Sequence, residues 1–290
     1  NRRSFIQNAA IATAGLSMLE TIVAEAGVKW TVGCFNRPWT KWSFAESLDG
    51  IKAAGYSVTG LLTTTKEDHF TGSDVTQEYL KGVSNKLKQR GLRANMCALK
   101  VRSDQAFETA RTDLRKQIDN ASFLKLEFAL TFGVDKKEEY ENYFKLMSDA
   151  AAYSAEKKVK LVMKPHGGAS GASSEILAAI KKVGHRNFKI WYDAGNIIYY
   201  TGKDPVTELM PIIEHVTGFC AKDCAAEKSD VMIQFGDGKV NFHDVFAKLK
   251  SAGFHGPIMV ECCKVGATPQ ETARNAEANR LFLEKVLKTL

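Results

Sequence analysis

Residues 160–193 read KLVMKPHGGASGASSEILAAIKKVGHRNFKIWYD and contain two short apolar runs, 160–164 and 189–193, on either side of a segment with helical periodicity. Each run has the length of a buried strand, and the segment between them is long enough for a crossover helix. A strand, a helix and a second strand in this order form a parallel unit. The stretch therefore predicts an α/β fold.

The same alternation continues along the chain from residue 27. Strands are expected at 30–35, 58–63, 94–99, 124–130, 160–164, 189–193, 218–222 and 258–261, with helical patterns between them. Gly55 and Gly253 follow the last periodic residues of two helical segments, as C-cap glycines do. Eight such units favour a closed barrel, whereas six or seven would permit a doubly wound open sheet. We expect residues 27–290 to form a single-domain (β/α)8 TIM barrel.

The composition excludes several classes of protein. Of the 290 residues, 44% are hydrophobic and 25% are charged, which is typical of a globular chain. The sequence contains no apolar stretch long enough to span a bilayer. The net charge is +7, but lysines stand beside acidic residues, as in KKEE at 136–139, which indicates solvated helix faces rather than a nucleic-acid surface. The expected partner is a small molecule, and homo-oligomer formation is left open.

The first 26 residues form a separate segment. Arg2 and Arg3 precede an apolar stretch at 9–19, and residues 24–26 read AEA, which has the A-x-A form of a cleavage site. This order resembles a twin-arginine export signal. It predicts cleavage after Ala26 and a periplasmic or exported protein. The alternative is an amphipathic helix with a chance arginine pair.

The cysteines show no spacing that indicates a disulfide framework or a structural zinc site. We therefore expect them to be small buried hydrophobic residues, although an oxidising compartment would allow a disulfide. The six cysteines are Cys34, Cys97, Cys220, Cys224, Cys262 and Cys263.

Polar residues gather where the last four predicted strands end. Lys164 ends the fifth predicted strand and His166 follows it, and Asp193, Lys222 and Glu261 end the sixth, seventh and eighth. The carboxyl ends of barrel strands meet at one mouth, so these side chains should converge there. Unpaired carboxylates after such apolar runs would be costly, which requires a cation nearby. A divalent metal, Lys164, Lys222 or all three could supply it.

Motifs in the second half of the chain extend this interpretation. They are YDAGN at 192–196, Lys222-Asp223, FGDGKVNF at 235–242 and GFHGP at 253–257 ahead of Glu261. Together they resemble the sugar phosphate isomerase/epimerase family of xylose-isomerase-like TIM barrels, over residues 28–288. In that family, one divalent metal is held by Glu, Asp, His and Glu after strands five to eight, and the two Glu residues move protons.

The resemblance places Asp193 and Glu261 at two of the four metal positions, while Lys164 and Cys220 stand where the family has Glu and His. A protonated lysine cannot ligate a metal and would repel a dication. Cys220 could bind a soft metal as a thiolate. Two alternatives therefore remain open, a single divalent ion (Mn, Mg, Zn or Co) at Asp193 and Glu261, or no metal.

Proton abstraction beside a sugar carbonyl, with the resulting enediolate held by a cation, is compatible with both alternatives. Glu261 is the expected base and Lys164 the expected cation. His166 would hydrogen-bond or protonate a sugar oxygen. The simpler alternatives are that Lys164 only neutralises a carboxylate and that His166 is structural.

The expected substrate-binding residues are Lys222, Asp193, Asn196 and Trp39. Lys222 and Asp193 would orient sugar hydroxyl groups. Trp39 belongs to a group of aromatic residues on predicted mouth loops, with Trp42, Tyr199 and Tyr200, whose rings could stack on a sugar or pack in the core.

These expectations define an isomerase or epimerase acting on an unphosphorylated sugar or keto-sugar, because an exported protein meets few sugar phosphates. One alternative is a keto-glycoside lyase or hydrolase that begins with the same proton abstraction. Another is a catalytically inactive sugar-binding protein, as the missing metal ligands suggest. The related endonucleases would need more His and carboxylate ligands than these strand ends offer.

Overall fold

The computed structural model describes residues 30–65 and 67–290, and its strands form a closed parallel barrel. Consecutive strands pair in chain order, and the last strand pairs with the first. The predicted (β/α)8 TIM barrel is thus confirmed. The strands are β1 (Val32–Phe35), β2 (Val58–Leu61), β3 (Arg93–Ala98), β4 (Phe128–Thr131), β5 (Lys160–Met163), β6 (Phe188–Tyr192), β7 (Val216–Ala221) and β8 (Ile258–Val260).

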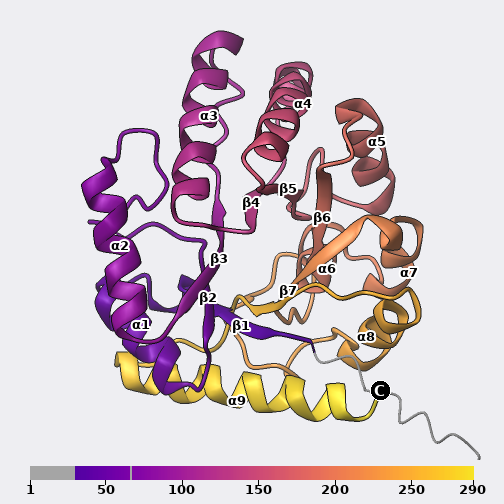
Figure 1. The fold of residues 1–290 in the computed structure, drawn as a ribbon. Helices are drawn as coiled ribbons and strands as arrows, with labels where there is room; N and C mark the ends of the chain where they lie inside the picture. Colours follow the sequence, from indigo (N-terminus) through magenta and orange to yellow (C-terminus); the bar gives the residue numbers. More distant parts are fainter. Residues whose placement is uncertain (1–29, 66) are drawn as a thin grey trace, which may run out of the picture.

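Helices surround the strands in a ring, and the last helix, α9, returns to lie beside α1 (Figure 1). No helix in the described part of the chain has the length and apolarity needed to cross a bilayer. The helices are η1 (Arg37–Trp39), α1 (Phe44–Ala53), α2 (Gln77–Gln89), α3 (Phe107–Phe123), η2 (Lys137–Glu139), α4 (Tyr140–Glu156), α5 (Ser173–Val183), α6 (Ala194–Thr201), α7 (Pro205–Leu209), η3 (Met210–His215), α8 (Phe242–Ser251) and α9 (Pro269–Lys288).

Local sequence signals set the ends of these helices. Ser43 and Glu46 form a reciprocal capping box at the start of α1, which satisfies backbone N–H groups that the first turn leaves free. Helices α1 and α8 end just before Gly55 and Gly253, whose φ angles are 84° and 73°. These are left-handed conformations that glycine adopts without a steric penalty. The two predicted C-cap glycines are confirmed.

The fourth strand begins later than the predicted range of 124–130. Leu124 caps α3, because its N–H donates to the carbonyl of Asn120, and Lys125 takes a left-handed φ of 57°. Leu126 is buried, but it precedes β4, which starts at Phe128. The predicted start of the fourth strand was therefore wrong, because the leucines in the turn after α3 have the same apolar pattern as the strand that follows.

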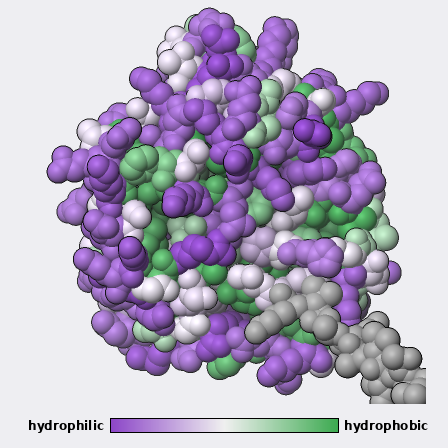
Figure 2. Space-filling model, viewed as in Figure 1, coloured by the Kyte–Doolittle hydropathy of each residue, from purple (hydrophilic) through white to green (hydrophobic). Residues whose placement is uncertain are grey.

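Apolar side chains form two cores, one inside the barrel and one between the strands and the helices. The outer core is the larger of the two. Hydrophilic residues cover most of the face seen in Figure 2, and apolar residues appear there in small groups. The inner core contains Phe35, Val58, Leu62, Met96, Phe128, Leu130, Val162, Trp191, Cys220 and Met259.

The predicted export signal at 1–26 lies outside the described residues. All six cysteines are described, and each is buried with a free thiol, as expected.

Candidate active site

The barrel brings five charged side chains together at the carboxyl ends of its strands. Lys164, Asp193, Lys222 and Glu261 directly follow β5, β6, β7 and β8, and Arg37 begins η1 just after β1. Because all strands are parallel, the residues that follow them lie at the same end of the barrel. The predicted convergence of the first four is therefore observed, and we call the five residues the ionic cluster.

The ammonium group of Lys164 lies between the two carboxylates of the cluster. Its Nζ is 2.8 and 2.6 Å from Oε1 and Oε2 of Glu261, and 3.1 Å from Oδ2 of Asp193. All three side chains are at most 1% exposed. At these distances the cation stabilises both negative charges in a medium that screens them weakly.

Lys222 makes a second bridge between the same carboxylates. Its Nζ is 2.8 Å from Oδ1 of Asn196 and 2.9 Å from Oε1 of Glu261. It also lies 3.4 Å from Oδ2 of Asp193. Gly195 leaves room for this side chain, since a Cβ there would overlap Lys222. The AGN sequence at 194–196 thus places the lysine as well as its amide partner.

Arg37 is the member of the cluster that sequence reasoning missed. Its Nη1 donates to Oε1 of Glu261, and its side chain is one-third exposed (33%). The signal that could have found it is its position, because it follows the first strand as Lys164 follows the fifth. The sequence analysis instead assigned an aromatic residue of the same loop, Trp39, to the substrate.

The cations determine the protonation of the buried carboxylate. Burial alone would raise the pKa of Glu261, but Lys164, Lys222 and Arg37 outweigh this effect and hold it well below the usual value. Burial would likewise lower the pKa of Lys222, but Asp193 and Glu261 raise it above its usual value. Glu261 is therefore an anion and Lys222 a cation at neutral pH.

Asp193 connects the cluster to α6. Its Oδ1 accepts the backbone N–H of Asn196 at 2.8 Å and so caps the helix. Its Oδ2 receives no hydrogen bond with adequate geometry from the described residues, although two ammonium groups lie within 3.4 Å. The carboxylate is thus held at one oxygen by hydrogen bonding and at the other by charge alone.

His166 stands beside the cluster in an aromatic setting. Its ring centroid is 5.1 Å from that of Phe132 and 4.8 Å from that of Tyr200, whose hydroxyl lies within 3.1 Å of either imidazole nitrogen. Burial, reinforced by Lys164 and Lys222, lowers the pKa of His166 to about 4. The imidazole is therefore neutral at neutral pH and can accept a proton.

A cavity of about 380 Å³ opens above the cluster at the mouth of the barrel. Its walls include Arg37, Lys222, His166, Asn196 and Tyr200, with Tyr199 and residues 228–232 completing them. Lys164, Asp193 and Glu261 are not among the described residues that line it. The predicted base and its two closest partners thus lie beneath the floor of the cavity, whereas His166 faces it.

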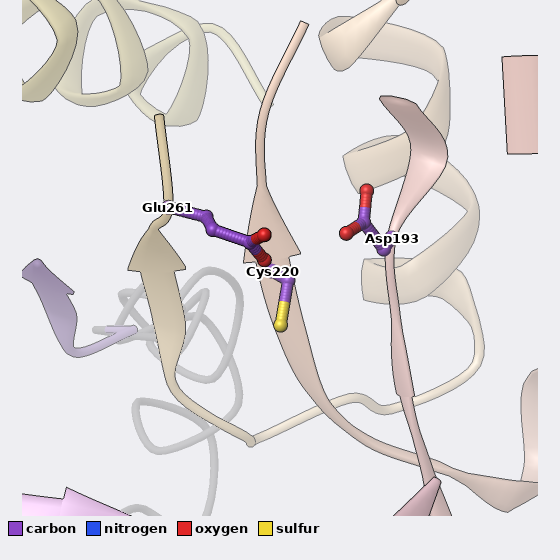
Figure 3. A group of neighbouring side chains, drawn as sticks. All are labelled: Asp193, Cys220 and Glu261. Atoms are coloured by element: carbon purple, nitrogen blue, oxygen red, sulfur yellow. The ribbon is translucent and has the colours of Figure 1, made fainter. Parts of the chain in front are cut away.

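The donor set does not suit a divalent metal. Oxygen or sulfur atoms of Asp193, Cys220 and Glu261 lie within 4.8 Å of one another, and the two carboxyl groups flank the strand that carries Cys220 (Figure 3). The Cys220 thiol belongs to the inner core, and burial raises its pKa well above the usual value, which keeps it protonated. The Lys164 ammonium lies between the carboxylates and would repel a dication. These residues therefore fit the ammonium group of Lys164 rather than a metal ion.

Trp39 is not at the mouth, contrary to the expectation that it binds substrate. Its ring is fully buried, its Nε1 donates to the carbonyl of Pro269 at 3.2 Å, and it packs so closely on Gly50 that a Cβ there would overlap it. The ring therefore joins η1 to α1 and α9. Of the aromatic residues considered, Tyr199 and Tyr200 line the cavity.

The closed parallel barrel defines this protein as a TIM barrel. Its polar site lies at the carboxyl ends of the strands, where enzymes with this fold have their active sites. A family model described as xylose isomerase-like TIM barrel matches residues 48–286. The chain belongs to this family. A comparison with curated protein sequences finds no match.

Several solved structures share the fold at low sequence identity. A xylose isomerase-like TIM barrel protein from Mycobacterium smegmatis, in complex with magnesium, has a TM-score of 0.72 and 14% identity, over 90% of this chain and 97% of its own. D-allulose 3-epimerase from Methylomonas sp. has a TM-score of 0.71 and 16% identity, over 89% and 98%. A probable 3-DHS dehydratase from Bacillus anthracis has a TM-score of 0.68 and 16% identity, over 88% of this chain and 98% of its own.

Proposed function

We propose that this protein is a metal-independent isomerase or epimerase that moves a proton next to the carbonyl group of an unphosphorylated sugar or keto-sugar. The observation that carries the proposal is the position of the ionic cluster directly beneath a cavity that the neutral His166 faces. The cluster provides fixed positive charge, and the imidazole provides a base. Both are needed to form and hold an enediolate.

In this proposal His166 removes the proton from the carbon next to the carbonyl. The electrons of the C–H bond form the enediolate, whose oxygen is stabilised by the positive charge of the ionic cluster, which reaches the cavity wall at Lys222. The imidazolium then returns the proton to the neighbouring carbon on the same face, while the hydroxyl proton of that carbon moves to the former carbonyl oxygen. In an epimerisation, water protonates the opposite face of the same carbon and the imidazolium loses its proton to solvent. With a pKa of about 4, His166 is as strong a base as an ordinary glutamate.

Glu261 is less suited to this role than the sequence suggested. Both of its oxygens already contact cations, its pKa is lowered well below the usual value, and it lies below the cavity floor. A carboxylate held in this way is a weak base. We assign it the task of positioning Arg37, Lys164 and Lys222.

The solved structures that share this fold support this class of reaction. The Methylomonas structure is a D-allulose 3-epimerase, a similar structure from Clostridium cellulolyticum is a D-psicose 3-epimerase with D-tagatose, and the Bacillus anthracis structure is a probable 3-DHS dehydratase. At identities of 12–16%, their substrates do not transfer to this chain. What supports the proposal here is the charge and geometry of the cluster.

Solvent exchange tests the proposal. The protein would be incubated in D₂O with a panel of ketohexoses and 3-keto-sugars, and deuterium at carbon would be followed by NMR. We expect exchange with at least one compound, and a rate reduced about 100-fold or more in His166→Gln. His243→Gln, which removes an exposed histidine on α8, is the control and should retain the wild-type rate.

Two outcomes contradict the proposal in different ways. Saturable binding without exchange across the panel would indicate a sugar-binding protein. Exchange that persists within a few-fold in His166→Gln would show that another group is the base.

A keto-glycoside lyase is a second candidate, and one further cavity favours it. A space of about 560 Å³ lies over β2 to β4, and its lining includes Phe132, one of two aromatic residues that pack on His166. A second sugar or an aglycone could occupy this space while the first sugar lies above the cluster. Release of a free aglycone from a 3-keto-glycoside would distinguish the lyase from an isomerase, which leaves the glycosidic bond intact.

A further inference from the structure

The ionic cluster carries one more positive than negative charge. Arg37, Lys164 and Lys222 are opposed by the carboxylates of Asp193 and Glu261. The nearest thiols do not add negative charge, because burial raises the pKa of both Cys220 and Cys262. An excess charge beneath a cavity is unfavourable unless a ligand balances it.

Arg37 is the cation with donors left for a ligand. Lys164 and Lys222 each use their ammonium group on contacts with buried oxygens. Nη1 of Arg37 donates to Glu261, and within the described part of the chain this is the one hydrogen bond that the Arg37 side chain makes. Its side chain is one-third exposed and lines the cavity wall. A guanidinium edge matches the two oxygens of a carboxylate.

The surrounding wall also favours an anion. Lys228, which lines the same cavity, places its Nζ 4.4 Å from the centre of the Tyr200 ring. The acidic residue of the wall, Asp230, is exposed and uses Oδ1 to accept the backbone N–H of Met232 at 2.8 Å. The cavity wall therefore remains positive after its own carboxylate is counted.

A carboxylate fits this site better than a phosphate group. The glycine-rich loop at 236–240 could otherwise offer backbone N–H groups to a phosphate, but Gly236, Gly238 and Val240 donate theirs to Asp223. The group that remains to bind an anion is the single guanidinium of Arg37, in a cluster with one excess positive charge. This matches a singly charged anion rather than a phosphate dianion.

We propose that the substrate is an acidic sugar, such as a uronate or a keto-sugar acid, whose carboxylate binds the free edge of Arg37. This inference rests on the proposed function and names the substrate class for the same site. Binding there would neutralise the cluster and hold the sugar chain against His166. The reactive carbonyl would then lie at a fixed distance along the sugar from its carboxylate.

Paired ligands test this proposal by equilibrium binding. Calorimetry at constant ionic strength would compare D-glucuronate with D-glucose, and D-galacturonate with D-galactose, up to about 50 mM. We expect a uronate to bind at least tenfold more tightly than its neutral partner. Arg37→Gln should remove this preference, and Lys228→Gln, at an exposed site, should weaken uronate binding about threefold.

Lys81→Gln removes an exposed lysine from α2 and is the matched control, so its preference should equal that of the wild type. Lys228→Gln and the wild-type comparison still test the proposal if Arg37→Gln does not fold. Equal binding of the paired sugars, no binding of either uronate, or tighter binding of glucose 6-phosphate would overturn it.

The outcomes separate this inference from the proposed function. Uronate binding without deuterium exchange would contradict the isomerase but support the acidic ligand. Exchange with neutral sugars alone would do the reverse.

Discussion

Lys164 is the residue on which the charge balance of the site depends most, because its ammonium contacts both buried carboxylates. Lys164, Lys222 and the two carboxylates are almost fully buried, and Arg37 is the partly exposed member of the cluster. Removing Lys164 would leave Oε2 of Glu261 and Oδ2 of Asp193 without their nearest cation, which costs far more than breaking an exposed ion pair.

We expect Lys164→Met to lower the free energy of unfolding by about 3 kcal/mol or more, because Asp193 and Glu261 would lose the nearer of the two ammonium groups that bridge them. Urea denaturation followed by circular dichroism measures this change. Arg93→Met is the matched control, since it breaks the exposed pair of Arg93 and Glu127 and should have almost no effect. Equal losses in the two variants would show that Lys164 is not essential to the cluster.

The titration of His166 gives a second prediction. The pKa of His166 in the folded protein is about 4, below the usual 6.5, so the unfolded chain binds the proton more readily. Stability contributed by the neutral imidazole is present above pH 6.5 and is lost as the pH falls from about 6.5 toward 4. Proton NMR should show one imidazole titrating near 4, and this signal should be missing in His166→Gln. A midpoint near 6.5 would contradict the buried setting.

The sequence predicted four of the five residues in the cluster, because each directly follows a strand that its apolar pattern identifies. Arg37 was missed, since it does not end a predicted strand but begins the short 3-10 helix that follows the first strand. Trp39 was assigned to the substrate for the same reason. Pattern alone does not show whether an aromatic side chain near a strand end points into the mouth or into the core.

At the level of elements, Asp223 organises the connection from β7 to α8. Its two carboxylate oxygens accept the backbone N–H groups of Cys224, Gly236, Gly238 and Val240 at 2.8–3.0 Å. The side chain is fully buried. It therefore holds a loop that also supplies part of the cavity wall, at residues 228–232.

Asp223→Asn should loosen this connection, because an amide offers one acceptor oxygen in place of two. We expect a loss of about 2 kcal/mol or more in the free energy of unfolding. Hydrogen–deuterium exchange should also become faster at 236–240. Asp237→Asn, at an exposed position in the same loop, is the control. Unchanged protection at 236–240 in Asp223→Asn would contradict this role.

The Lys222-Asp223 motif was recognised from the sequence, but the role of its aspartate was not. That role depends on amides 13 to 17 positions further along, which come back to the carboxylate only in the folded loop. Local pattern also failed at β4, where a buried leucine belongs to the turn after α3. Such contacts are set by tertiary packing, which periodicity does not report.

For the whole molecule, eight strand–helix units were enough to predict the closed barrel, since eight parallel strands joined by helical connections make up a TIM barrel. The depth of the site could not be predicted. Whether a carboxylate after a strand faces the cavity or lies beneath a cation depends on side-chain lengths around the entire ring.

The proposed export signal makes a separate prediction. We expect the mature protein to begin at Gly27, and replacement of Arg2 and Arg3 by lysine to keep the protein in the cytoplasm, because the paired arginines are the recognised feature of the signal. Cell fractionation and amino-terminal sequencing measure this outcome. Export that is unchanged by both replacements would contradict the twin-arginine assignment.

The central claim is that the ammonium of Lys164 holds the two buried carboxylates together in place of a divalent metal. Metal analysis of the wild-type protein, purified without chelator, tests it most directly. The account predicts less than about 0.1 equivalent of any divalent metal and no loss of solvent exchange activity after dialysis against EDTA. One equivalent of bound metal, or activity that EDTA removes and a divalent ion restores, would contradict it.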